Sequence, residues 1–171
     1  MIRILVPVSD SACALAAVRH AIFRFHEGSL SEVVLLNVQP PLEHTRASAF
    51  HSLAALREQE CRDGESALAR ASALLEESGV PYTAIVGVGE PCRAINATAE
   101  SMHCEAIVIG ASPWNRFQAW LGSGLLVRLI RKASVPVTVV HFPDLPGTPD
   151  SQPGRPGTRL LPGRPKLIVY P

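Results

Sequence analysis

Two glycine-containing segments in the second half of the chain carry residue types that bind phosphate groups. An apolar run over 106–109 ends at Gly110, and Gly122-Ser123-Gly124 stands where a helix is expected to begin. Backbone N–H groups at a helix amino terminus attract anions, and a serine hydroxyl adds another donor. The loop after Gly110 and the Gly-Ser-Gly segment are therefore a candidate site for a phosphate or another anion.

A structural interpretation of these residues stays open beside the functional one. Serine is among the commonest helix N-caps, so Ser123 can simply cap the helix that follows. Arg116, in the loop between the two segments, can either face a bound phosphate or be solvated. Trp114 and Trp120 either fold inward or form an outward apolar patch.

The elements that must position these segments alternate along the chain. Branched apolar runs predict buried strands at 2–8, 33–38, 82–86, 106–110 and 135–140. Apolar spacings of three and four residues predict helices at 14–25, 53–75, 91–102 and 124–132, with Ser9-Asp10-Ser11 supplying capping chemistry and Gly64 as a weak point. This order predicts an α/β fold with a five-stranded parallel sheet, right-handed crossovers and helices on both faces, in which 2–8 is the central strand.

Length and composition predict one domain and exclude some partners. The chain has 171 residues, is 47% apolar and carries a formal net charge of +1. This length and apolar content suffice for one full aliphatic core. The small net charge provides no positive electrostatic field to attract nucleic acid. No apolar run reaches the ~20 residues of a membrane span, and the first strand follows Met1 without a charged leader. We expect a cytoplasmic protein that binds neither nucleic acid nor membrane.

The composition changes near residue 142. We expect residues 1–142 to form the α/β domain and residues 143–171, rich in proline and glycine, to form an extended or disordered tail. Alternatively, the apolar segment 166–170 adds a short strand to an edge of this sheet or of a neighbouring subunit.

Neither the cysteines nor the histidines predict a metal site. The cysteines are scattered without a Cys-x-x-Cys pair and are interpreted as small hydrophobes: Cys13, Cys61, Cys92 and Cys104. Cys92 has a redox alternative, because the helix start at 89–91 can lower the pKa of a thiol in the first turn. His44 and His51 fall in or near a polar loop, where solvation is expected.

Taken together, several segments of the chain resemble the universal stress protein family over residues 2–141. The likeness rests on the order and spacing of Ile4-Leu5-Val6-Pro7-Val8, Leu36-Asn37-Val38, Ile107-Val108-Ile109-Gly110, Gly122-Ser123 and Val135-Pro136-Val137. The resemblance implies a Rossmann-like fold similar to the adenine nucleotide alpha hydrolases. It also implies an ATP site in which Val8 and Val38 line the adenine, Ser9 follows the first strand, Gly110 lines the ribose, and Gly122, Ser123 and Gly124 hold the phosphates.

The chain departs from the family's ATP-binding pattern at two places. Pro113 stands where the second glycine of a Gly-x-x-Gly is expected, and the spacing from there to Gly122 is one residue short. Proline lacks both the N–H and the positive φ that glycine would offer to a phosphate. Ser9 occupies the position of the family's nucleotide-contacting aspartate, and Asp10 comes one position later.

These departures favour a non-catalytic stress-response protein whose nucleotide site is lost or weakened. The alternative is an ATP-binding switch or a very slow ATPase; no carboxylate pair or lysine is predicted to converge on the phosphates, so we do not expect an enzyme. A phosphoryl-accepting receiver lacks an acceptor aspartate after 85–87, and a Rossmann dehydrogenase lacks Gly-x-Gly-x-x-Gly after the first strand.

The last predicted strand is also a candidate interface. The resemblance implies a homodimer through this strand, here Pro136, Val137, Val139 and His141, and its branched run is a plausible edge for pairing. In the alternative, the tail covers this edge and leaves a monomer.

Overall fold

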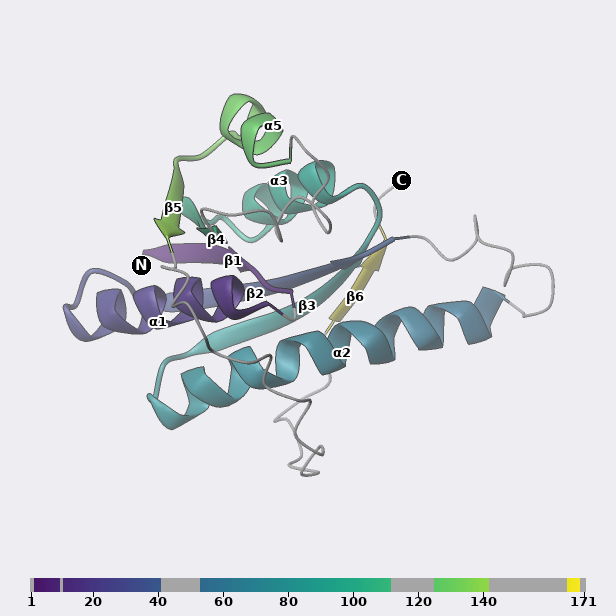
Figure 1. Cartoon of the computed structure of the whole chain (residues 1–171), viewed down its shortest axis with the longest axis horizontal. Helices are drawn as coiled ribbons and strands as arrows, with labels where there is room; N and C mark the ends of the chain where they lie inside the picture. Colours follow the sequence, from purple (N-terminus) through teal and green to yellow (C-terminus); the bar gives the residue numbers. More distant parts are fainter. Residues whose placement is uncertain (1, 10, 41–52, 112–124, 142–165, 170–171) are drawn as a thin grey trace, which may run out of the picture.

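The computed structural model describes residues 2–9, 11–40, 53–111, 125–141 and 166–169. Its centre is a parallel sheet (Figure 1). The strands are β1 (Arg3–Pro7), β2 (Glu32–Gln39), β3 (Tyr82–Val88), β4 (Ala106–Ala111), β5 (Val137–His141) and β6 (Lys166–Val169). They lie in the order β5-β4-β1-β2-β3-β6. The predicted five-stranded parallel sheet, with the first strand in the middle, is confirmed.

The sixth strand comes from the end of the tail. It pairs in parallel with β3, with Lys166 opposite Ile85 and Val169 opposite Val88. For 166–170 the sequence predicted either an extended or disordered tail or a strand at a sheet edge. In the structure, Lys166–Val169 form a strand at the edge of this sheet. The proline-rich segment 142–165 lies outside the described residues.

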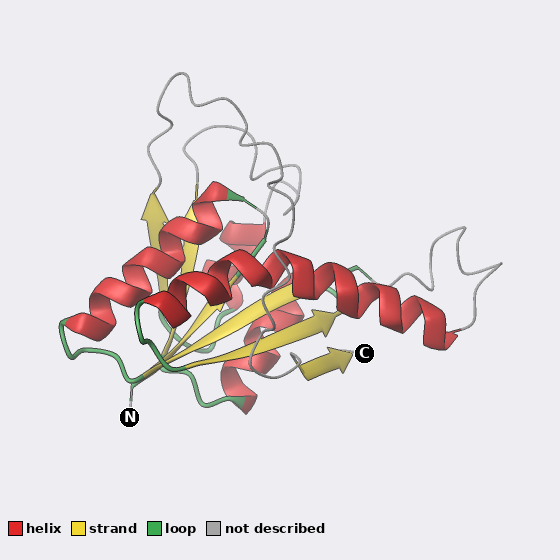
Figure 2. Cartoon of the chain, turned by 90° about the horizontal axis from the view of Figure 1, so that it is seen from below, coloured by secondary structure: helices red, strands yellow, loops and turns green. Residues whose placement is uncertain are grey.

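Helices cover both faces of the sheet, as predicted. Helices α1 (Ala12–His26) and α2 (Leu53–Glu77) lie on one face, and α3 (Pro91–Ser101) and α5 (Leu125–Lys132) lie on the other (Figures 1 and 2). Successive residues of a strand pack into the cores on opposite faces of the sheet. Leu35 packs on the α1–α2 side, whereas Leu36 packs on the α3–α5 side. Because both faces are buried, the strands read as continuous apolar runs rather than alternating ones.

The helix ends follow local capping chemistry. Ser11 caps α1, because its Oγ accepts a hydrogen bond of 3.2 Å from the Ala14 N–H. Glu90 caps α3 and accepts from the Arg93 N–H at 2.9 Å, with Pro91 in the first turn. Gly79 follows α2 at φ +66, a left-handed conformation that glycine adopts without strain.

Helix α2 crosses the sheet on a buried stripe that includes the glycine predicted to weaken it. Leu68, Ala71 and Leu75 of this stripe are fully buried. A Cβ built on Gly64 would lie only 2.5 Å from Cγ1 of Val86 on β3. Gly64 therefore permits a close helix–sheet approach, and a side chain at this position would have to displace Val86. Among the described helices, none combines the length and the apolar character needed to cross a membrane.

Candidate functional site

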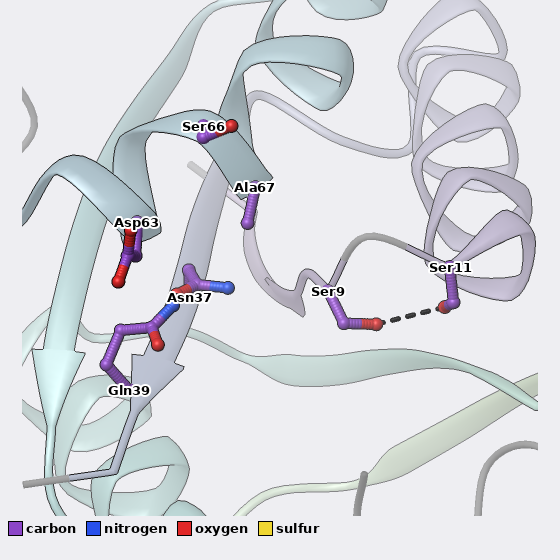
Figure 3. Close-up of a pocket in the computed structure, with 7 residues that line it drawn as sticks. All are labelled: Ser9, Ser11, Asn37, Gln39, Asp63, Ser66 and Ala67. Atoms are coloured by element: carbon purple, nitrogen blue, oxygen red, sulfur yellow. Dashed lines mark hydrogen bonds between the residues drawn. The ribbon is translucent and has the colours of Figure 1, made fainter. Parts of the chain in front are cut away.

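A polar pocket opens at the carboxyl ends of β1 and β2, beside α2 (Figure 3). Its volume is about 410 Å³, within the range of small-molecule sites. Six of its seven lining residues carry a hydroxyl, amide or carboxylate group: the lining is Ser9, Ser11, Asn37, Gln39, Asp63, Ser66 and Ala67. β1 adjoins the point where the strand order reverses, because β2 lies on one side of it and β4 on the other. Open α/β sheets bind ligands at this place.

The floor of the pocket is a fixed chain of amide hydrogen bonds. Asn37 is 2% exposed, and its Nδ2 donates to the carbonyl oxygen of Val8 at 2.8 Å. Its Oδ1 accepts from Nε2 of Gln39 at 2.7 Å. Both polar ends of the buried Asn37 amide are thus satisfied, which offsets the cost of burying them. The end of β1 is tied to β2, so the pocket floor is formed before any ligand arrives.

The wall beside α1 consists of two serine hydroxyls. The Oγ atoms of Ser9 and Ser11 lie 2.9 Å apart and share a hydrogen bond, drawn in Figure 3. The Ser11 oxygen also accepts from the Ala14 N–H. The prediction that 9–11 begins a helix is confirmed for Ser11, and the same cap holds the Ser9 hydroxyl at the pocket rim.

The opposite wall is one side of α2. Asp63 is followed three and four residues later by Ser66 and Ala67, the spacing that places side chains on one helix face. Asp63 is exposed, and it has no ion-pair or hydrogen-bond partner among the described residues. In Figure 3 its carboxylate points toward Asn37 and Gln39 on β2. A carboxylate, two amides and several hydroxyls can bind a ligand rich in hydrogen-bond donors.

The structure gathers only part of the predicted site around this pocket. Ser9 lines it. Val8 and Val38 are buried on opposite faces of the sheet, Val8 in the α1–α2 core and Val38 in the α3–α5 core, and neither lines the pocket. Their predicted contacts with an adenine stay predictions. Gly122, Ser123 and Gly124 lie outside the described residues; α5 begins at Leu125, directly after them, as the predicted helix start requires.

Gly110 has a packing role that sequence reasoning missed. It lies near the end of β4, and a Cβ built on it would overlap the backbone carbonyl of Cys13 in the first turn of α1. Gly110 does not have a positive φ. The close approach of Cys13, and not the backbone conformation, therefore requires glycine here. The predicted ribose contact of Gly110 remains untested.

Ser11 was predicted only as capping chemistry, and four further polar residues of the lining were not predicted as site residues: Asn37, Gln39, Asp63 and Ser66. Asn37 carried a usable signal, because a polar residue inside the apolar run 33–38 must find buried partners. Asp63 and Ser66 carried none, since polar residues on the exposed side of a long helix are ordinary.

The cysteines are packed side chains, as the main interpretation predicted. Cys13, Cys92 and Cys104 are buried, and Cys61 is half-buried. Burial raises the pKa of the Cys92 thiol, and nearby Glu90 raises it further, which opposes the lowered pKa of the redox alternative. Burial also raises the pKa of Cys104 to about 11. Within the described ranges, no three His, Cys, Asp or Glu side chains gather as metal ligands. His44 and His51 lie outside these ranges.

The predicted interface strand is an edge of the sheet. β5 pairs with β4 on one side and ends the strand order on the other. Val137, Val139 and Val140 are only partly buried, and His141 is exposed. At the opposite edge, β6 covers β3.

A parallel sheet whose core order is 3-2-1-4-5, with a polar pocket at the carboxyl end of its central strands, defines a Rossmann-like α/β protein. The chain belongs to the universal stress protein family, whose model matches residues 1–141. It is 25% identical to universal stress protein MJ0531 of Methanocaldococcus jannaschii over 143 residues, which is 82% of each chain.

Solved structures show the same fold. A universal stress protein family member from Burkholderia pseudomallei has a TM-score of 0.61 at 19% identity, covering 81% of this chain and 94% of its own. An Arabidopsis thaliana family member with AMP bound has a TM-score of 0.58 at 18% identity, covering 88% of this chain and 98% of its own. A universal stress protein in complex with cAMP has a TM-score of 0.58 at 15% identity, covering 82% and 97%.

Proposed function

We propose that this universal stress protein is a non-catalytic binder of adenine nucleosides and nucleotides whose phosphate subsite is weakened. The observation that carries the proposal is the preformed polar pocket beside Ser9 and Asn37, at the carboxyl ends of β1 and β2. It has the size of a small-molecule site and lies next to the reversal of strand order. Structural relatives carrying AMP and cAMP support an adenine ligand over other small polar molecules.

The weakened phosphate subsite follows from the sequence beyond the pocket. Pro113 removes an N–H and a positive φ that a glycine would offer to phosphate oxygens. Gly122-Ser123-Gly124 still precedes the start of α5 and retains backbone donors. Phosphates therefore add little to the affinity. Because the site does not hold the phosphates firmly in position, the protein does not hydrolyse ATP.

Calorimetric titration with adenosine, AMP and Mg-ATP tests this proposal, with tryptophan emission as a second readout. We expect all three ligands to bind. ATP should bind no more than about tenfold more tightly than adenosine, because the weakened phosphate contact adds only about 1 kcal/mol of binding free energy. No phosphate should be released. An ATP affinity several hundredfold above that of adenosine would favour an ATP-dependent switch instead. Absence of binding by all three would mean that the site is lost.

A homodimer through β5 is the second part of the proposal. β5 ends the strand order, and Val137 and Val139 are only partly buried, whereas β6 protects the other edge. Light scattering of the full chain and of a chain ending at residue 142 should give twice the monomer mass, which is 18.3 kDa for the full chain. Monomers in both samples would overturn the dimer. We also propose a cytoplasmic location, which fractionation of cells can test.

A further inference from the structure

We propose that the edge of β3 is a self-association surface that fits the β3 edge of a second copy of this chain, and that β6 is an intramolecular strand that keeps this edge occupied. The inference goes beyond the proposed function, because it requires no ligand. It concerns the sheet edge opposite β5, and it gives the tail of the chain a role in limiting assembly.

β6 lies outside the part of the chain that matches the family. The family model covers residues 1–141, whereas β6 is Lys166–Val169. Without β6 the strand order would end at β3, as it ends at β5 on the other side. β6 pairs with Ile85–Val88, the second half of β3, and lies beside it in Figures 1 and 2. It therefore occupies backbone N–H and C=O groups that this half of β3 would otherwise leave open to another chain.

The residues of β3 would make a sticky edge. β3 is seven residues long and reads Tyr-Thr-Ala-Ile-Val-Gly-Val, with neither a proline nor a charged residue. Its second half, Ile85–Val88, consists of buried apolar residues and a glycine. Uncharged apolar edge strands of this kind pair readily with further chains. Two such edges related by a twofold axis pair antiparallel with each other, so a second copy of this chain fits.

β6 has the protective features that β3 lacks. It is only four residues long and begins with Lys166. Pro165 directly precedes it, and Pro171 follows after Tyr170. Proline has no N–H to donate to a further strand, and a short strand with a charged residue is a poor template for pairing. A sheet that ends at β6 therefore offers a second copy much less edge than a sheet that ends at β3.

The covalent link gives β6 an advantage over a second copy. β6 belongs to the same chain as β3, and the segment 142–165 joins it to β5. A tethered strand acts at an effective concentration on the order of millimolar, far above the concentration of a dilute protein. At such dilution β6 therefore occupies the β3 edge, and a second copy reaches this edge only when β6 is disabled.

Proline substitutions in β6 test the proposal by light scattering of the full chain over a range of concentrations. Consecutive N–H groups of a strand point in opposite directions, so Leu167→Pro combined with Ile168→Pro removes the one that faces β3, whichever it is. We expect the mass of this double variant to rise with concentration to about twice that of the unmodified chain or more. A chain ending at residue 165 removes β6 without adding prolines and should behave in the same way. Circular dichroism establishes that each variant retains its fold.

A matched control and a rescue assign the effect to β6. Ser151→Pro combined with Gln152→Pro adds the same number of prolines before β6 without changing the charge, and should keep the mass of the unmodified chain. A synthetic peptide of residues 164–171 should restore that mass to the double variant, because it fills the β3 edge in trans. A peptide of the same composition in scrambled order should not.

Two results would overturn the inference. If the double variant keeps the mass of the unmodified chain at every concentration, the β3 edge is not a self-association surface. If the variant associates but the 164–171 peptide does not reverse the association, another surface is responsible. The β5 dimer is judged separately: a monomeric unmodified chain contradicts that dimer, whereas a rise in mass that the peptide reverses still supports the β3 edge.

Discussion

Two helices approach the sheet through a glycine, but they meet different obstacles. At the contact of α1 with β4, a Cβ on Gly110 would overlap the backbone carbonyl of Cys13. At the contact of α2 with β3, a Cβ on Gly64 would meet the side chain of Val86. A backbone carbonyl inside a helix cannot move without displacing the helix, whereas a valine can be shortened by substitution.

The difference separates a fixed contact from an adjustable one. α1 carries the Ser11 cap and lies against the end of β4, so its position is set by backbone against backbone. α2 carries Asp63 beside Gly64, and its distance from the sheet depends on one side chain of β3. The α2 wall of the pocket can therefore be shifted by single substitutions that leave the rest of the fold in place.

The largest effect is expected at the fixed contact. Gly110→Ala should lower the free energy of unfolding by about 3 kcal/mol or more, because overpacking against backbone has no local relief. Urea unfolding measures this loss. Gly79→Ala is the control, because a Cβ at this position meets nothing within 4 Å. This variant should lose only the cost of a positive φ in alanine, about 1 kcal/mol of the free energy of unfolding. Equal losses in the two variants would contradict the backbone contact.

A smaller effect is expected at the adjustable contact. Gly64→Ala should gain about 1 kcal/mol of helix propensity but lose more by overpacking against Val86, for a net loss of about 1 to 2 kcal/mol. Adding Val86→Ala should make room for the new methyl group. We expect the double variant to be more stable than the sum of its single changes predicts, measured as a double-mutant cycle. Strict additivity would show that the two residues do not oppose each other.

Thiol labelling can report on the two contacts separately. Cys13 is buried at the α1–β4 contact, whereas Cys61 is half-buried on α2, one turn before Gly64. In the native protein, Cys61 should react about tenfold or more faster than Cys13, Cys92 and Cys104, because burial slows attack. Mass spectrometry after a pulse of reagent measures this order. Gly110→Ala should accelerate Cys13 selectively; equal acceleration of all four would indicate global unfolding instead.

The smallest effect concerns the far end of α2. The Tyr82 hydroxyl donates to Oε1 of Glu76 at 2.6 Å, and burial together with this carboxylate raises the pKa of Tyr82 from 10.0 to about 12. The folded state holds the Tyr82 proton more tightly than the unfolded state does. The contribution of Tyr82 to the free energy of unfolding is therefore complete below pH 10 and is lost as the pH rises through 12. Tyr82→Phe should therefore lose less stability between pH 10 and 12 than the unmodified chain in urea unfolding. Parallel losses would contradict the shift.

The fold was predictable because its signals are local. The branched apolar run at 33–36 indicates a strand buried on both faces, and Ser11 followed by periodic apolar residues indicates a capped helix. Alternation of such elements then permits few topologies, and the predicted parallel sheet with the first strand in its middle is the one observed. The end of the tail was less predictable, because a short apolar segment specifies neither disorder nor a particular sheet edge.

The candidate site was predictable only along the strands. Ser9 was found because it follows the first strand at the position where the family resemblance expects a nucleotide-contacting aspartate. Asp63 was not, because nothing in its local sequence distinguishes it from any other charged residue on the outside of a helix.

The residue order alone therefore determined the elements, the parallel sheet and the family, since periodicity and spacing are properties of neighbouring residues. Only the tertiary structure decided that Gly64 and Gly110 are close contacts and that Asp63 faces Asn37 across a pocket. These relations join residues far apart in the chain, and they depend on how closely each helix approaches the sheet, which is set by the volume of the side chains between them.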